Sequence, residues 1–135
     1  MVEKKKHSKA IFRKFSYAFR GLFISLKEEK SLVIHFIFAT LSIIIGIILQ
    51  LAPVSWAVLI LTVGLVVSSE LMNTAIENVV DMVAFKYNFN AKKIKDIAAA
   101  ATLVLAVVAI IVGLLLFIPR IVTFIQHGYG YGGWA

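Results

Sequence analysis

Residues 69–81 read SELMNTAIENVVD and end a long apolar run of the chain. The polar positions that recur at helical spacing in this stretch are Glu70, Asn73, Glu77 and Asp81. Intervals of 3, 4 and 4 residues, at about 100° per residue, place them on one narrow stripe of a helix. An acidic side chain inside a membrane span costs roughly 2.5 kcal/mol or more, so such residues are functional candidates. The stripe is therefore the first place to look for function.

The composition indicates an integral membrane protein with a single domain, residues 1–135. Hydrophobic residues make up 61% of the chain and charged residues only 16%. A soluble domain of this length has too little interior to hide so much apolar surface. The chain has no cysteine, which excludes disulfide bonds and cysteine-based metal or redox chemistry.

Residues 1–30 are predicted to form a basic amphipathic helix that lies on the membrane surface. Apolar side chains, four of them Phe, recur at helical spacing between residues 10 and 26, whereas Lys14, Arg20 and Lys27 take other positions. A calmodulin-type target helix or a soluble packing helix would have the same pattern. The membrane surface is favoured because a spanning segment follows at once.

Three apolar segments predict an all-α membrane fold with three transmembrane helices after the interfacial one. The first span is 31–51, whose 21 residues at 1.5 Å each give roughly 31 Å, enough to cross the hydrocarbon core. The second, 54–85, runs on through the acidic stripe, and the third is 97–118. A polar loop is expected at 86–96 and a C-terminal tail at 119–135. Within this tail, residues 121–125 are candidates to extend the helix, and residues 128–135 are Gly-rich and aromatic.

Lysine and arginine are distributed unevenly between the two sides of the membrane. Nine of the 14 precede the first span, four lie in the loop 86–96, and Arg120 alone is on the other side. This bias places the N-terminus and the second loop in the cytoplasm. The net charge of +7 therefore orients the chain and attracts anionic lipid, and it does not indicate nucleic acid. The acidic end of the second span should meet Glu28-Glu29 and Lys95-Asp96 at the cytoplasmic surface.

Two further features lie close to that surface. Glu28-Glu29-Lys30 is a charged junction before the first span, which is either a solvated turn or a source of a cation ligand. His35 lies inside the first span, near its start. The favoured interpretation is a histidine hydrogen-bonded to the next helix, and the alternative is a proton-relay or ligand role.

Carboxylates and lysines at a membrane surface suit a phosphate-bearing ligand that is held through Mg²⁺. Magnesium prefers one or two carboxylates, with phosphate and water completing its coordination. An apolar setting raises the basicity of a glutamate and helps it take a proton from a hydroxyl group. Glu70 is the deepest acid in the apolar run and so the candidate base, while Glu77, nearer the water, is the better metal ligand.

The residues alone leave three functions open. The chain has neither the Gly-x-x-x-x-Gly-Lys loop nor the Gly-x-Gly-x-x-Gly loop that cradles nucleotide phosphates, so a kinase would have to work without either. A small oligomeric ion or proton pathway lined by Glu70, Asn73 and Glu77 is equally physical. The stripe would also serve to hold helices together in a bundle.

The motif Glu-x-x-Asn-(Thr/Ser)-Ala-Ile-Glu-x-x-Val-Asp, present from Glu70 to Asp81, resembles the signature of the prokaryotic diacylglycerol kinase family. Lys95-Asp96 follows at the family's spacing, and the resemblance covers roughly residues 10–118. The order of elements also matches. Glu28-Glu29-Lys30 with His35 is similar to the Gram-positive branch, whose members are typically undecaprenol kinases.

The resemblance implies a lipid kinase of the bacterial cell membrane that spans it several times. Its reaction would be ATP- and Mg²⁺-dependent phosphorylation of a primary alcohol, with undecaprenol converted to undecaprenyl phosphate. The alternative acceptor is diacylglycerol, which would give phosphatidic acid. The family also implies a homotrimeric bundle with active sites shared between subunits, and a single three-helix chain has too little surface to enclose a nucleotide and a lipid.

The family's site residues map onto this chain by position. Glu70 resembles the catalytic base, and Ala99 falls where the lipid packs. Glu29 and Glu77 resemble the metal ligands, and Glu29 is preferred to Glu28 because it lies eight residues after Gly21.

The remaining implied positions bind the nucleotide or support the site. The resemblance implies ATP contacts at Tyr17, Glu29, Glu77, Lys86, Tyr87, Asn88, Lys95 and Asp96. It implies supporting polar roles for Asn73 and Asp81. The chain departs from the family at Ala10, where some members carry a basic residue that Lys9 or Arg13 would have to replace. The tail after Pro119 is longer than the family core, and no chemistry is assigned to it.

Overall fold

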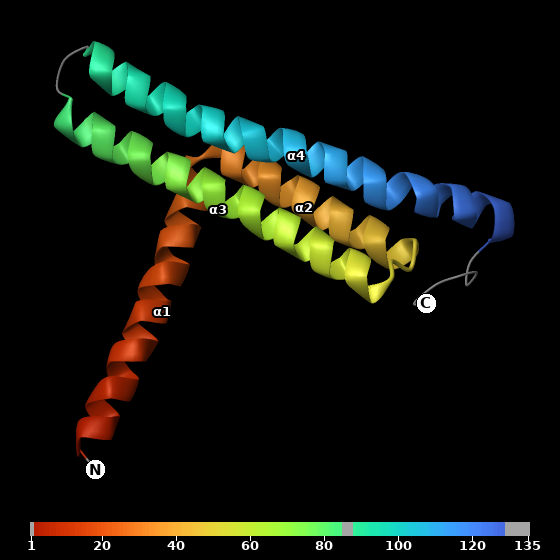
Figure 1. Ribbon diagram of the computed structural model, residues 1–135. Helices are drawn as coiled ribbons and strands as arrows, with labels where there is room; N and C mark the ends of the chain where they lie inside the picture. Colours follow the sequence, from red (N-terminus) through yellow and green to blue (C-terminus); the bar gives the residue numbers. More distant parts are fainter. Residues whose placement is uncertain (1, 85–87, 129–135) are drawn as a thin grey trace.

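The computed structural model describes residues 2–84 and 88–128, and its regular structure in these ranges is entirely α-helical (Figure 1). The four helices are α1 (Val2–Glu28), α2 (Lys30–Ile48), α3 (Pro53–Val83) and α4 (Phe89–His127). Helices α2, α3 and α4 are each long and apolar enough to cross a membrane. The predicted class, an all-α membrane fold with one N-terminal helix and three spans, is confirmed.

Helices α2, α3 and α4 lie side by side, whereas α1 leaves this bundle at a steep angle (Figure 1). The corner is Glu29, whose extended backbone (φ −109°, ψ 107°) separates the end of α1 from the start of α2. Helix α3 makes its largest contact with α4 and a smaller one with α2. Most of α1 therefore has no partner within the chain, and its Phe side chains at 12, 15, 19 and 23 are exposed. This exposure suits a helix that lies on a membrane.

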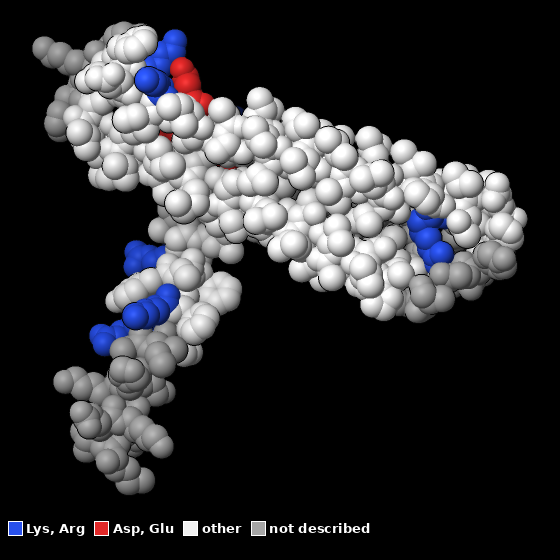
Figure 2. Space-filling view, in the orientation of Figure 1, with Lys and Arg blue, Asp and Glu red and all other residues white. Residues whose placement is uncertain are grey.

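Apart from buried Glu70, the charged side chains of the described bundle gather at its ends. Figure 2 shows basic and acidic groups together at the tip where α3 meets α4, and one basic site near the opposite end. The visible face between them is uncharged. Such an uncharged band is what a hydrocarbon core requires, because charged groups there are costly.

Helix α4 begins earlier than the sequence pattern predicts. Asn88 caps it, because the Asn88 side chain accepts a hydrogen bond of 2.9 Å from the backbone N–H of Asn90. Residues 89–96, expected in a polar loop, therefore form the first turns of α4. The loop interpretation overlooked the capping Asn88, which favours a helix start even though the lysines that follow do not suit the helix dipole. Lys86 and Tyr87 lie outside the described residues.

Helix α4 also runs beyond the predicted span 97–118, through Pro119 as far as His127, and so includes the candidate extension 121–125. Proline inside a helix removes one backbone hydrogen bond and usually bends or ends the helix. Beyond it, the Thr123 hydroxyl donates a 3.0 Å bond to the Pro119 carbonyl. Gly128, at φ 76°, then ends α4 in a conformation that favours glycine. The first part of the predicted tail 119–135 is thus helical.

Arg120 closes the end of the bundle that carries the α2–α3 turn. Its Nε donates a 2.7 Å bond to the Leu49 carbonyl, and an Nη donates a 2.9 Å bond to the Gln50 carbonyl. Carbonyls after the last turn of a helix have no partner within the helix, and a cation there also complements the helix dipole. Gln50 has a positive φ of 52°, which turns the chain at this point. Arg120 therefore ties α4 to the turn between α2 and α3.

Replacing Arg120 with Gln should lower the thermal midpoint of the purified protein in detergent, followed by circular dichroism. The two hydrogen bonds from the guanidinium predict a loss of about 1–3 kcal/mol in the free energy of unfolding. Arg20→Gln is the matched control, because Arg20 is exposed on α1. An unchanged midpoint in Arg120→Gln would contradict the clamp.

Gly46 permits close packing at the same end of the bundle. It is buried, and a Cβ atom there would lie 3.1 Å from Leu51 Cδ1 and 3.1 Å from Trp56 Cη2. Contacts this short force either the indole ring or the backbone to move. The absence of a side chain at Gly46 thus sets how closely Trp56 of α3 approaches α2.

Gly46→Ala should destabilise the protein by about 1–3 kcal/mol, despite the better helix propensity of alanine. Gly113→Ala is the control, because a Cβ there meets only Phe117 Cδ2, at 4.0 Å. Thermal melts of the two variants in the same detergent make the comparison. Equal midpoints for the two variants would count against the close contact with Trp56.

Candidate active site

Glu70 is the most buried charged group in the described part of the chain, with 5% of its surface exposed. It lies on the inner face of α3, together with buried Val66 and Thr74 one turn to either side. His35 of α2 faces its carboxylate, with 3.9 Å between His35 Nε2 and Glu70 Oε2, a contact that is an ion pair only when the imidazole is protonated. A carboxylate in such a setting is costly unless it is paired or put to use.

The stripe on α3 becomes more exposed towards the C-terminal end of the helix. Glu70 is buried, Asn73 and Glu77 are partly buried, and Asp81 is exposed. The helix thus carries a series of polar groups from the apolar part of the bundle to its charged tip. A ligand with an apolar body and a polar head group would fit along this series, with its body in the apolar part of the bundle and its head group towards the charged tip.

Asn73 and Glu77 form the middle of the stripe. Asn73 Nδ2 donates a 3.1 Å hydrogen bond to Glu77 Oε1. Asn73 Oδ1 is buried and has no hydrogen-bond partner in the described structure. A buried oxygen without a donor is unusual and calls for an explanation, such as a bound water or ion. The amide nitrogen of Asn73, not this oxygen, meets Glu77, whose carboxylate is a ligand type that Mg²⁺ accepts.

The described residues contain no group of three or more His, Cys, Asp or Glu side chains placed to hold a metal. Glu29, the other predicted metal ligand, is partly buried at the corner between α1 and α2. Its side chain makes no capping hydrogen bond to α2.

Asp81 and Lys95 join the exposed ends of α3 and α4. Lys95 Nζ lies 3.0 Å from Asp81 Oδ1 and 3.1 Å from Oδ2. An exposed pair of this kind contributes little stability. Its importance is positional, because it places a lysine next to the stripe.

Thr102 is a polar residue that the sequence pattern did not single out. It is buried, and its hydroxyl donates a 3.5 Å bond to the carbonyl of Ser69, next to Glu70. Ala98, one turn before it, is also buried. One face of α4 carries Lys95, Ala98 and Thr102 at helical spacing. This spacing was the sequence pattern from which the position of Thr102 beside the stripe could have been predicted. Ala99, the predicted lipid contact, is exposed and lies off that face.

The nucleotide-binding positions expected from the resemblance are scattered in a single chain. Tyr17 is 65% exposed on α1, the helix that leaves the bundle (Figure 1). Asn88 and Asp96 are exposed at the start of α4. Asp96 contributes to a shallow pocket of about 320 Å³ that also includes Lys92 and Lys93. One chain therefore brings together the stripe and Lys95, but it does not bring Tyr17 to them.

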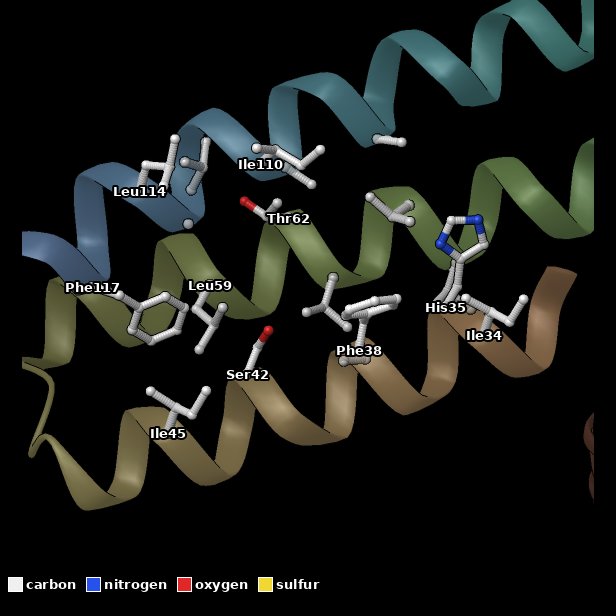
Figure 3. A pocket seen from close by; sticks show the side chains of 18 of the residues that line it. Ile34, His35, Phe38, Ser42, Ile45, Leu59, Thr62, Ile110, Leu114 and Phe117 are labelled. Atoms are coloured by element: carbon white, nitrogen blue, oxygen red, sulfur yellow. The ribbon is translucent and has the colours of Figure 1, made fainter.

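A larger cavity of about 610 Å³ runs between α2, α3 and α4 (Figure 3). Its walls are almost entirely apolar and include Phe38, Leu59, Ile110 and Phe117. His35, at one end, is the one ionisable side chain among the described residues that line it. The cavity thus leads along the apolar part of the bundle to the partner of Glu70.

A family model described as prokaryotic diacylglycerol kinase matches residues 16–117 of this chain. The chain belongs to that family. The match contains the whole polar stripe together with Lys95, and it ends just before Pro119. The family membership predicted from the motif is therefore confirmed.

Several curated members of the diacylglycerol kinase family are similar to this chain. The undecaprenol kinase of Bacillus subtilis is 37% identical over 110 residues, which cover 82% of this chain and 89% of the relative. The diacylglycerol kinase of Synechocystis is 38% identical over 110 residues, which cover 81% and 63%. The diacylglycerol kinase of Escherichia coli K12 is 30% identical over 101 residues, which cover 75% and 83%.

Proposed function

We propose that this protein is a membrane lipid kinase that transfers the γ-phosphoryl group of ATP to the primary alcohol of undecaprenol. The observation that carries the proposal is the stripe on α3. It leads from a buried carboxylate, Glu70, beside an apolar cavity to an exposed lysine–aspartate pair at the charged tip. A reaction between a lipid hydroxyl and a water-soluble phosphate donor needs such a path between the two phases.

Glu70 is proposed as the base. The lipid hydroxyl reaches it from within the bilayer, and a Glu70 carboxylate oxygen takes the hydroxyl proton as the hydroxyl oxygen attacks the γ-phosphorus. The bond between the γ-phosphorus and the β–γ bridging oxygen breaks at the same time, and ADP leaves. Phosphoryl transfer otherwise depends on alignment and on neutralising phosphate charge.

Glu29 and Glu77 are proposed to hold Mg²⁺, with the amide nitrogen of Asn73 donating a hydrogen bond to Glu77. When bound, the ion supplies positive charge to the phosphates of ATP. Lys95 adds a second positive charge, with Asp81 fixing the position of its ammonium group. Asp96, Asn88, Lys86 and Tyr87 are proposed as further nucleotide contacts.

We propose that the active form is a homotrimer with shared sites, oriented with the N-terminus and the α3–α4 connection in the cytoplasm. Tyr17 supports the shared site, because it is exposed on a helix that points away from the chain's own stripe. A neighbouring copy would bring α1, and Tyr17 with it, to that stripe. The uneven distribution of lysine and arginine supports the orientation.

Diacylglycerol is the second candidate acceptor, because relatives in Synechocystis and Escherichia coli are named diacylglycerol kinases. Undecaprenol is preferred because the Bacillus subtilis undecaprenol kinase matches at 37% identity across 89% of its length. An ion or proton pathway remains the non-enzymatic alternative. It predicts ion flux in liposomes without consumption of ATP.

The acceptor is tested by offering undecaprenol and diacylglycerol in parallel mixed micelles, with labelled ATP, Mg²⁺ and the purified protein. We expect label mainly in undecaprenyl phosphate. Label mainly in phosphatidic acid would keep the mechanism and change the substrate. A well-folded protein that labels neither lipid would contradict the kinase proposal.

Glu70→Gln should reduce kcat by about 10²- to 10⁴-fold and leave Mg-ATP binding nearly intact, because only the proton acceptor is lost. Glu29→Gln and Glu77→Gln should also weaken Mg-ATP binding, which calorimetry would measure at fixed magnesium. Glu28→Gln is the matched control for Glu29, since Glu28 is the exposed neighbouring acid. Near-normal turnover in Glu70→Gln would exclude Glu70 as the base.

A further inference from the structure

His35 is placed between the apolar cavity and the buried carboxylate. It lies on α2, and Figure 3 shows its ring at one end of the cavity, extending from α2 towards α3. Its side chain is 22% exposed, and it lines the cavity. Thr62 and Ser42 are the other polar groups in the cavity wall, and neither is ionisable.

The direction of the Glu70 carboxylate is the property that His35 is placed to influence. In the described part of the chain, His35 is the side chain that pairs with Glu70. A glutamate has several rotatable bonds, and without a partner its carboxylate can take more than one direction. The 3.9 Å between Nε2 and Oε2 is longer than a hydrogen bond. Contacts of this kind are often long in the ligand-free protein and shorten in the reacting complex.

We propose that His35 is a positioning residue for Glu70: its imidazole N–H directs the carboxylate towards the lipid hydroxyl that enters from the cavity. The inference rests on the proposed lipid kinase function. It adds a residue of α2 to a site otherwise built from α3, α4 and the α1–α2 corner. A neutral imidazole has one N–H and the protonated ring has two, so the role requires a donor and not a charge.

This role differs from that of a simple wall residue. If His35 only shaped the cavity, its loss would weaken lipid binding and raise KM with kcat unchanged. If it orients Glu70, its loss leaves lipid binding similar and lowers kcat, because a misplaced base acts only on the reacting state. A side chain of similar reach with an N–H group should restore the function. Glutamine is such a side chain.

The experiment measures kcat and the KM for undecaprenol in the full-length protein, its His35→Ala and His35→Gln variants, and the control Thr40→Ala. Thr40 is exposed five residues further along α2 and does not line the cavity. We expect His35→Ala to lose about 10- to 100-fold in kcat with KM within about threefold. His35→Gln should stay within about threefold of the parent in both constants, and Thr40→Ala should be unchanged. Circular dichroism and Mg-ATP binding establish that each variant is folded.

The outcomes separate this inference from the proposed function. An inactive parent protein would overturn both. An active parent with normal kcat in His35→Ala, or with only a raised KM, would overturn the positioning role alone. Equal losses of kcat in His35→Gln and His35→Ala would also overturn it, because a donor of similar reach would then be insufficient. If His35→Ala does not fold, His35→Gln decides the matter on its own: parent-like kcat supports the role, and a loss of tenfold or more contradicts it.

Discussion

The burial of the Glu70 carboxylate in an otherwise apolar helix bundle is the constraint on which the other features of the site depend. Burying a carboxylate in apolar surroundings raises the free energy of the folded protein. Such a group is therefore found where it has a polar partner or a function. His35 on α2 is the partner within reach, at 3.9 Å. From Glu70 the polar stripe continues along α3 until Asp81 meets Lys95. A lipid hydroxyl and a phosphate donor can therefore approach the same few residues from different phases.

The opposite end of the bundle gives the helices a fixed arrangement. Arg120 holds the carbonyls after α2, and the space over Gly46 admits the indole of Trp56. The contact between α3 and α4 continues from there to the Asp81–Lys95 pair. These contacts attach α2 to both α3 and α4 at the turn, and the same three helices line the cavity that has His35 at one end.

Much of this could be predicted from the sequence, because the strongest signals were local and periodic. Apolar length predicted three spans, and the spacing of Glu70, Asn73 and Glu77 predicted one polar face. Helix ends were harder, since the cap at Asn88 and the passage of α4 through Pro119 depend on single hydrogen bonds. Thr102 was missed because its partner is a backbone carbonyl 33 residues away. A contact between two helices leaves little trace in the hydrophobic periodicity of either helix's sequence.

The arrangement of α1 makes the account testable at the level of the assembly. Tyr17 is exposed on α1, the helix that leaves the bundle, so the proposed shared site requires a second copy. The most direct measurement is lipid phosphorylation by mixed oligomers of two separately inactive variants, Tyr17→Leu and Glu70→Gln, reassembled at equal ratio. Random mixing in a closed symmetric oligomer leaves both residues intact at about one shared site in four, so activity should return to about a quarter of the parent level. Mixtures that stay inactive would contradict the shared site, because each site would then be built within one chain.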